Sequence, residues 1–361
     1  FLEDMLTLIG YQPEEAAAFA PAILAMEVKA VAGAQSYAAA RNEASTAESL
    51  ISIETLASRY PNIDWPAMFA ARGAAATPDK VVVSDPDFLA GANDVLTEEN
   101  LDLVKAYLKL AVAFDLQQFL PANIRAKHFE FFRKALRGQE EPYERWRTCV
   151  LAVRDAMPEA VGRMFVEASG IAKDKPASLE VFKEIRGALQ HRIETADWVS
   201  EETRAAALEK LSALRASFVM PDEWRDDRSL AAVDGDAVAT LERFSVARRA
   251  RSFARLGQPL DINEWFDPPT YVSAFQVNET NAIYATAAQM LMLDIGSDDP
   301  AVIYGGLGTF LGHEISHGYD KLGAQYDGAG RVRDWWAPAD AAAFAEKTQC
   351  VSDEASTYQY P

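Results

Sequence analysis

The feature that most constrains the structure of this 361-residue chain is a pair of histidines four residues apart, His313 and His317. Residues at positions i and i+4 lie one above the other on the same face of an α-helix. The chain holds only four histidines, and a composition estimate puts the chance of this pattern well below about one in a hundred. The spacing therefore predicts a helix that aims two imidazoles at one point.

Glu314, directly after the first histidine, indicates which chemistry the two histidines could take part in. Imidazole nitrogens are ligands of Zn²⁺, and a glutamate one residue on reaches the water that such a metal activates. His-Glu-x-x-His on a helix is the motif of zinc peptidases. The competing interpretation is a surface helix with two solvated histidines. We predict one zinc ion held by His313 and His317, with Glu314 as the catalytic general base.

The residues before the motif predict a buried helix. Ile303, Leu307 and Leu311 recur at helical spacing in a stretch of small and apolar residues, so we expect packing on both sides of the helix. Four glycines between residues 305 and 312 cost roughly 1 kcal/mol each relative to alanine. We therefore expect another element to approach the helix backbone closely.

A third zinc ligand is harder to place. The class of zinc peptidases with a third histidine would need Gly at 320 and His at 323, but the chain has Asp320 and Gly323, which excludes that class. The other main class takes a glutamate from a later helix. Glu346 and Glu354 are within reach, but neither has an Asp four residues on that could brace a zinc histidine.

A longer pattern surrounds the motif. Its pieces are Gly305-Gly306, Gly318-Tyr319-Asp320, Gly323, Tyr326-Asp327, Arg333-Asp334-Trp335-Trp336 and Thr348-Gln349-Cys350. Together with the helix they closely resemble the neprilysin and endothelin-converting enzyme family of zinc metallopeptidases, in the form of a bacterial-type member. Weaker resemblance at residues 146–149, 160–167 and 221–226 extends it over most of the chain. The resemblance implies the same roles for His313, Glu314 and His317.

The resemblance also implies a peptide-binding strand. The family's Asn-Ala pair on an edge strand falls, counted back from the helix, on Ser273-Ala274, and a literal Asn281-Ala282 lies eight residues later. Spacing favours Ser273 and Ala274 as the substrate-binding residues. Serine can donate and accept a hydrogen bond but lacks the two-pronged amide of asparagine. We expect peptides to dock by strand addition, with pockets that differ from those of typical relatives.

The family's third zinc ligand, a glutamate, would lie beyond Pro361. The chain is then a fragment, a nicked chain whose C-terminal remainder is a separate polypeptide, or a degenerate protein. We favour the first two, because a protein that had lost catalysis would have little reason to keep both histidines and Glu314.

The sequence pattern of the chain changes near residues 245–260, where we expect a domain boundary. Before it, helical periodicity and start signals predict helices over 13–43, 98–119, 124–137, 142–169, 179–197 and 201–213. After it, residues 271–284 are rich in aromatic and β-branched residues and predict strands. We expect a mainly α fold with a smaller α+β part. The resemblance implies a helical lid domain, 1–250, facing the N-terminal part of a thermolysin-like (gluzincin) catalytic domain, 251–361, around a central chamber.

The composition of the chain limits which kinds of partner it could bind. A net charge of −19 disfavours binding to nucleic acid or to anionic membranes. The sequence contains no run of about 18 apolar residues that could span a membrane. The start at Phe1 has neither Met nor signal character, so we expect a trimmed or internal start. With the resemblance, this implies an extracytoplasmic protein that is periplasmic, secreted or membrane-anchored through a missing N-terminal segment. In the family, the positions of Cys149 and Cys350 are typically disulfide-bonded, sometimes to cysteines outside this span. The two cysteines could therefore pair with each other or lack partners, and two buried thiols are the alternative.

These features predict a zinc-dependent endopeptidase that hydrolyses oligopeptides, on the amino side of hydrophobic residues by family resemblance. A catalytically incomplete peptide-binding or scaffold protein on the same fold is the alternative. A zinc aminopeptidase of another gluzincin family is a second rival. Asp320 and residues 333–336 argue against that rival.

Overall fold

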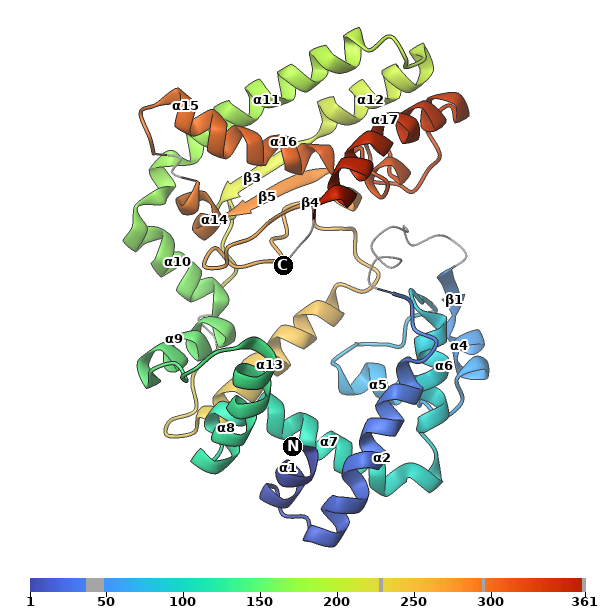
Figure 1. The fold of residues 1–361 in the computed structure, drawn as a ribbon, viewed down its shortest axis with the longest axis vertical. Coiled ribbons are helices and arrows are strands. Elements are labelled where there is room, and N and C mark those ends of the chain that lie inside the picture. Colours follow the sequence, from blue (N-terminus) through green and yellow to red (C-terminus); the bar gives the residue numbers. More distant parts are fainter. Residues whose placement is uncertain (37–48, 227–229, 294–295, 359–361) are drawn as a thin grey trace. The chain divides into compact units, whose positions relative to one another are not determined.

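The computed structural model describes residues 1–36, 49–226, 230–293 and 296–358. Helices dominate, and the described residues form a two-stranded and a three-stranded sheet (Figure 1). The chain divides into two compact units. The described residues of the first are 1–36, 49–157, 226 and 230–259, and those of the second are 158–225 and 260–358. Across the described ranges, no helix is long and apolar enough to cross a membrane.

The first unit is a set of helices with one small hairpin-like sheet. Its α-helices are α1 (Leu2–Leu8), α2 (Pro13–Val31), α4 (Ile53–Arg59), α5 (Trp65–Ala71), α6 (Pro86–Val95), α7 (Leu101–Asp115), α8 (Ala122–His128), α9 (Arg145–Ala156) and α13 (Ala237–Ala254). Strands β1 (Leu50–Ser52) and β2 (Lys80–Val82) pair antiparallel. Met5, Leu6, Ile23 and Leu110 form the centre of a buried apolar cluster, which ties α1, α2 and α7 together.

The second unit places helices on a three-stranded sheet. Its α-helices are α10 (Pro158–Ser169), α11 (Lys175–Thr195), α12 (Glu201–Ala213), α14 (Ala287–Met292), α15 (Pro300–Ile303), α16 (Thr309–Ser316) and α17 (Pro338–Thr357). The strands β3 (Arg215–Val219), β5 (Ala282–Thr286) and β4 (Ala274–Val277) lie in the order β3-β5-β4. β3 runs parallel to β5, and β4 runs antiparallel to it.

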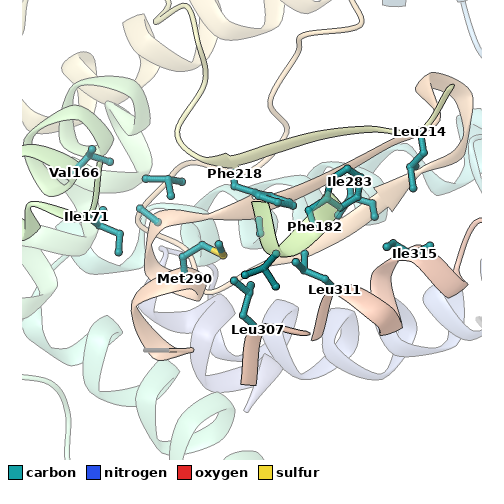
Figure 2. Packing of buried hydrophobic residues seen from close by; sticks show 14 of the residues in the cluster. Val166, Ile171, Phe182, Leu214, Phe218, Ile283, Met290, Leu307, Leu311 and Ile315 are labelled. Atoms are coloured by element: carbon teal, nitrogen blue, oxygen red, sulfur yellow. The ribbon is translucent and has the colours of Figure 1, made fainter. Parts of the chain in front are cut away.

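The central strand β5 is buried along its whole length because both faces of the sheet are covered. Successive side chains of a strand point to opposite faces. On one face Ile283 joins the apolar cluster that contains Phe218 of β3 and Leu311 of α16, as Figure 2 shows. On the other face Tyr284 packs against Trp265. Each such side chain contributes about 1.5–3 kcal/mol on burial, so this strand anchors the unit.

The predicted helices are confirmed in kind, but several boundaries are wrong. The helix predicted over 13–43 ends at Val31 as α2, and residues 37–43 of that prediction lie outside the described ranges. The helix over 201–213 is α12, and Ser200 caps it by accepting a hydrogen bond from the Thr203 amide. The helix predicted over 142–169 is two helices, α9 and α10, which meet at Met157 and Pro158. Proline lacks the amide that would continue the first helix, so the break follows from the sequence. The mainly α fold with a smaller α+β part is confirmed.

The chain crosses between the two units at three places in the described residues, after Met157, Arg225 and Pro259. The crossing at Pro259 and Leu260 lies at the end of the predicted range. The crossing after Met157 is unforeseen: α10, α11 and α12 belong to the unit of the sheet, because residues such as Phe182 share the buried cluster of β3 and β5. The functional division into a lid, 1–250, and the start of a catalytic domain, 251–361, stays a prediction.

Candidate metal centre

The helix with the two histidines, α16, is buried on one face. Leu307, Leu311 and Ile315 are each at most 1% exposed and point into the cluster under the sheet (Figure 2). They are four residues apart, so they form one stripe. His313, on another face, is exposed. The predicted packing on both sides is therefore wrong among the described residues: the apolar stripe holds the helix, and the histidine lies off it.

The glycines before the motif differ in their surroundings. A Cβ added to Gly306 would lie 3.3 Å from the backbone oxygen of Leu293, whereas Gly305 and Gly312 have nothing within 4 Å of such a Cβ. The expected close approach is thus found at Gly306 but not at the other two. Residues Tyr304–Gly308 form a π-helical turn directly before α16. Such wide turns occur frequently at functional sites, and glycines permit them locally.

The two imidazoles converge. The Nε2 atoms of His313 and His317 are 3.1 Å apart, and the ring planes are inclined by 84°. Two nitrogens that share one tetrahedral zinc at about 2.0–2.1 Å lie about 3.4 Å from each other. The spacing of the two rings therefore fits a shared zinc ion, and the predicted convergence is what the structure shows.

Asp320 orients the second histidine. Its Oδ2 atom lies 2.7 Å from Nδ1 of His317, while its Oδ1 atom accepts from the amides of Leu322 and Gly323 at 2.9 and 2.8 Å. With the proton on Nδ1, the imidazole donates to the carboxylate and leaves the Nε2 lone pair free for a metal. From the sequence alone, Asp320 separates peptidase classes and belongs to the family pattern, but its contact with His317 is not predicted. A carboxylate three residues after a ligand was the signal that could have found it.

Glu314 is a buried carboxylate beside both imidazoles. Its side chain belongs to the buried set, at 5% exposure. Burial raises its pKa above the usual range, and the nearby His317 and His313 oppose that effect. A raised pKa brings a carboxyl group closer to the neutral range in which it exchanges protons efficiently. The environment therefore suits a general base.

The described residues supply two ligands and no third. No group of three or more His, Cys, Asp or Glu side chains that could hold a metal occurs in the part of the chain that the structure describes. Glu346 and Glu354 are both exposed on α17. The pair His313 and His317 thus fits zinc by its donor atoms and spacing, but the ligand set that these residues form is incomplete.

The edge strand β4 lies against the end of α16. A Cβ on Gly318 would lie 3.1 Å from Nε2 of Gln276 on β4. The backbone oxygen of Ser273 accepts from the amide of Thr286 on β5. Because these groups alternate along an antiparallel strand, the N–H and C=O of Ala274 point to the opposite, outer edge, which has no partner strand among the described residues.

The side chain of Ser273 bonds within the chain. Its hydroxyl donates to Oδ2 of Asp267 at 2.5 Å. Contact with a peptide through this hydroxyl is therefore limited to its acceptor side, whereas Ala274 offers both backbone groups. The substrate-binding role of Ser273 and Ala274 stays a prediction, which the geometry favours more for Ala274.

The cysteines Cys149 and Cys350 form no disulfide in this structure, and both are exposed. The alternative of two buried thiols is therefore wrong. A disulfide bond to a cysteine outside this span, which the family resemblance implies as one possibility, stays a prediction.

Sequence comparison places the chain among known peptidases. Two models of "Peptidase family M13" match residues 1–221 and 269–361. Neprilysin-11 of Caenorhabditis elegans is 26% identical over 86% of this chain and 38% of its own length. An endothelin-converting enzyme homolog of Locusta migratoria is 29% identical over 85% of this chain and 44% of its own length. The chain thus spans less than half the length of these relatives.

Solved structures agree with these matches. The Mycobacterium tuberculosis zinc metalloprotease Zmp1, solved with an inhibitor, matches 99% of this chain and 55% of its own at a TM-score of 0.89 and 27% identity. PepO of Lactobacillus rhamnosis matches 96% of this chain and 55% of its own at a TM-score of 0.85; at 23% identity this shows the fold alone. The family models cover most of the sequence and the resemblance seen in it is confirmed: the chain belongs to peptidase family M13.

Proposed function

We propose that this chain carries the zinc-binding helix of a zinc-dependent endopeptidase that hydrolyses oligopeptides. One observation carries the proposal: the Nε2 atoms of His313 and His317 lie 3.1 Å apart beside the buried Glu314, in a chain of peptidase family M13. The chain spans about half of the solved relative, so the activity of a whole protein of this family is part of the proposal.

The residues divide the chemistry among them. Zinc, when bound by His313 and His317, would polarise a peptide carbonyl and acidify a water molecule. Glu314, a buried carboxylate beside the two imidazoles, would take a proton from the attacking water and pass it to the nitrogen of the amine that leaves when the peptide bond breaks. Asp320 holds the proton of His317 on Nδ1 and keeps the ring in the orientation that binding requires.

The third protein ligand in this proposal is a glutamate that follows residue 361, in a longer chain or a separate polypeptide. The absence of a third His, Cys, Asp or Glu near the two imidazoles in the described ranges supports it, as does the greater length of the relatives. The same observation favours the second candidate function, a catalytically incomplete peptide-binding or scaffold protein.

The substrate in this proposal is an extended peptide that adds to the outer edge of β4. Ala274 would receive it through its backbone N–H and C=O, next to the end of α16. Cleavage on the amino side of hydrophobic residues and an extracytoplasmic location are carried over from the family resemblance.

Metal binding and hydrolysis test the proposal separately. Zinc affinity, measured by competition with a chelator, should fall at least about tenfold in His313→Ala and stay near the wild-type value in Glu314→Gln. Hydrolysis of a blocked-amino-terminus peptide is measured with the protein extended beyond residue 361. Glu314→Gln should abolish turnover; retained hydrolysis in that variant contradicts the assignment. Zinc affinity that is equal in the wild type and His313→Ala would support the scaffold protein instead.

A further inference from the structure

Lys210 is a buried cation in the second unit that the proposed chemistry does not use. It lies near the end of α12, and it is 2% exposed. Its Nζ atom donates to the backbone oxygens of Gly323 and Tyr326, both at 2.7 Å. A buried ammonium group is costly unless hydrogen bonds satisfy it. The positions of these two carbonyl groups are therefore coupled to the position of α12.

Aromatic contacts strengthen this attachment. The Nζ atom of Lys210 lies 5.6 Å from the ring centre of Tyr319 and 5.7 Å from that of Trp335, within the range of cation–π attraction. The hydroxyl of Tyr319 donates to the backbone oxygen of Ala207, one turn earlier on α12, at 3.0 Å. The segment that follows the second zinc ligand is thus bound to one face of α12.

Gly323 connects this attachment to the metal centre. Its carbonyl accepts from Lys210, and its amide donates to Oδ1 of Asp320. A Cβ on Gly323 would lie 1.9 Å from the backbone oxygen of His317, so the two backbones are in direct contact. A displacement of Gly323 would therefore move the carboxylate that orients His317.

The chemistry of Lys210 argues for a role in geometry rather than in stability. Burial lowers the pKa of its ammonium group to about 8, against the opposing effect of the Asp320 and Asp327 carboxylates. An apolar side chain of similar size in such a place is often neutral or stabilising. Methionine would fill the space but could not bind the carbonyls of Gly323 and Tyr326.

We propose that Lys210 is a positioning residue for the metal centre: through Gly323 it holds the segment in which Asp320 orients His317. The inference rests on the proposed zinc-binding function. Lys210 lies more than a hundred positions before His313 and His317 in the sequence, on α12, which packs against the segment that follows His317.

Lys210→Met separates the two roles. Zinc affinity of the 361-residue chain should fall about ten- to a hundredfold, while the denaturant midpoint of unfolding stays the same or rises. In the metal-free chain, the amides of Leu322 and Gly323, which donate to Asp320, should exchange their hydrogens faster. In the double variant Lys210→Met/Asp320→Asn the zinc affinity should fall little further than in Asp320→Asn alone, because both changes act on the same orientation.

Lys175→Met is the matched control. Lys175 lies in the same unit and, like Lys210, makes two hydrogen bonds through Nζ. It donates to the backbone oxygen of Met220 at 3.1 Å and to Oδ1 of Asp222 at 2.7 Å. Zinc affinity and amide exchange at residues 322 and 323 should match the wild type. If Lys210→Met does not fold, Lys210→Gln, whose shorter side chain reaches less far, should still lower zinc affinity and speed amide exchange at residues 322 and 323 relative to the wild type.

The inference is overturned if a folded Lys210 variant keeps wild-type zinc affinity and amide exchange, or if Lys175→Met loses as much of each. Failure of the proposed function has a different result. If the proposed function is wrong, His313→Ala binds zinc as the wild type does, and Lys210 then has no role at a metal centre. Amide exchange in the metal-free chain still decides whether Lys210 holds the segment.

Discussion

The two sides of the metal centre are built in opposite ways. On the sheet side, α16 packs through apolar side chains, with Leu311 at 0% exposure. On the other side, the segment after His317 is held by polar groups: Asp320, Asp327 and Lys210 each bond to backbone groups of that segment. Apolar burial is strong but non-directional, whereas hydrogen bonds fix angles. The comparison suggests that the first side supplies stability and the second supplies ligand geometry.

The largest expected effect is on the apolar side. Leu311→Ala removes a fully buried side chain and leaves a cavity, which costs about 2–5 kcal/mol of unfolding free energy. Denaturant unfolding followed by tryptophan fluorescence measures it. The folded fraction of the variant should bind zinc as the wild type does. A weaker zinc affinity in folded Leu311→Ala would break the division between the two sides.

The next effect is a dependence of stability on pH that comes from the polar side. Because burial lowers the pKa of Lys210 from 10.5 to about 8, the unfolded chain binds more protons than the folded chain between these values. The contribution of Lys210 to the unfolding free energy should therefore rise as the pH rises from about 8 to 10.5, by about 3 kcal/mol in all.

Denaturant unfolding at several pH values, compared between the wild type and Lys210→Met, isolates this contribution. The variant should lack the rise, and Lys175→Met should keep it. An equal rise in all three proteins would show that other groups cause it.

Asp320→Asn should act on the ligand without much effect on stability. The amide that replaces the carboxylate is a weaker acceptor for the Nδ1 proton of His317, so zinc affinity should fall about ten- to a hundredfold, or about 1.4–2.8 kcal/mol. The carboxylate is half-buried, so the unfolding midpoint should change little. Chelator competition and denaturant unfolding test the two parts. A fall in stability as large as the fall in binding would remove the contrast with Leu311.

The same contrast explains what the sequence could predict. Periodicity identified the apolar stripe of α16 and of the π-helical turn before it, because Leu307 and Leu311 are four residues apart, and the motif identified His313 and His317. The polar side joins residues far apart in the chain: Lys210 bonds to Gly323 over 113 positions. No local pattern encodes such a pair. It requires the three-dimensional packing of α12 under the loop, so Lys210 was visible in the sequence only as one more helical lysine.

The last effects, of which that of Gly312 is the smallest, concern two glycines on the two sides of His313 and His317. Gly312, within α16, has open space where a Cβ would be, so Gly312→Ala should raise the unfolding free energy by about 0.5–1 kcal/mol through helix propensity. Gly323→Ala would place a Cβ 1.9 Å from the backbone oxygen of His317. It should lower stability by about 1–3 kcal/mol and weaken zinc binding, because the loop must move. Unfolding and chelator competition on both variants test this. If Gly323→Ala left zinc affinity unchanged, the loop would tolerate displacement, and the polar side would not set the geometry of the ligand.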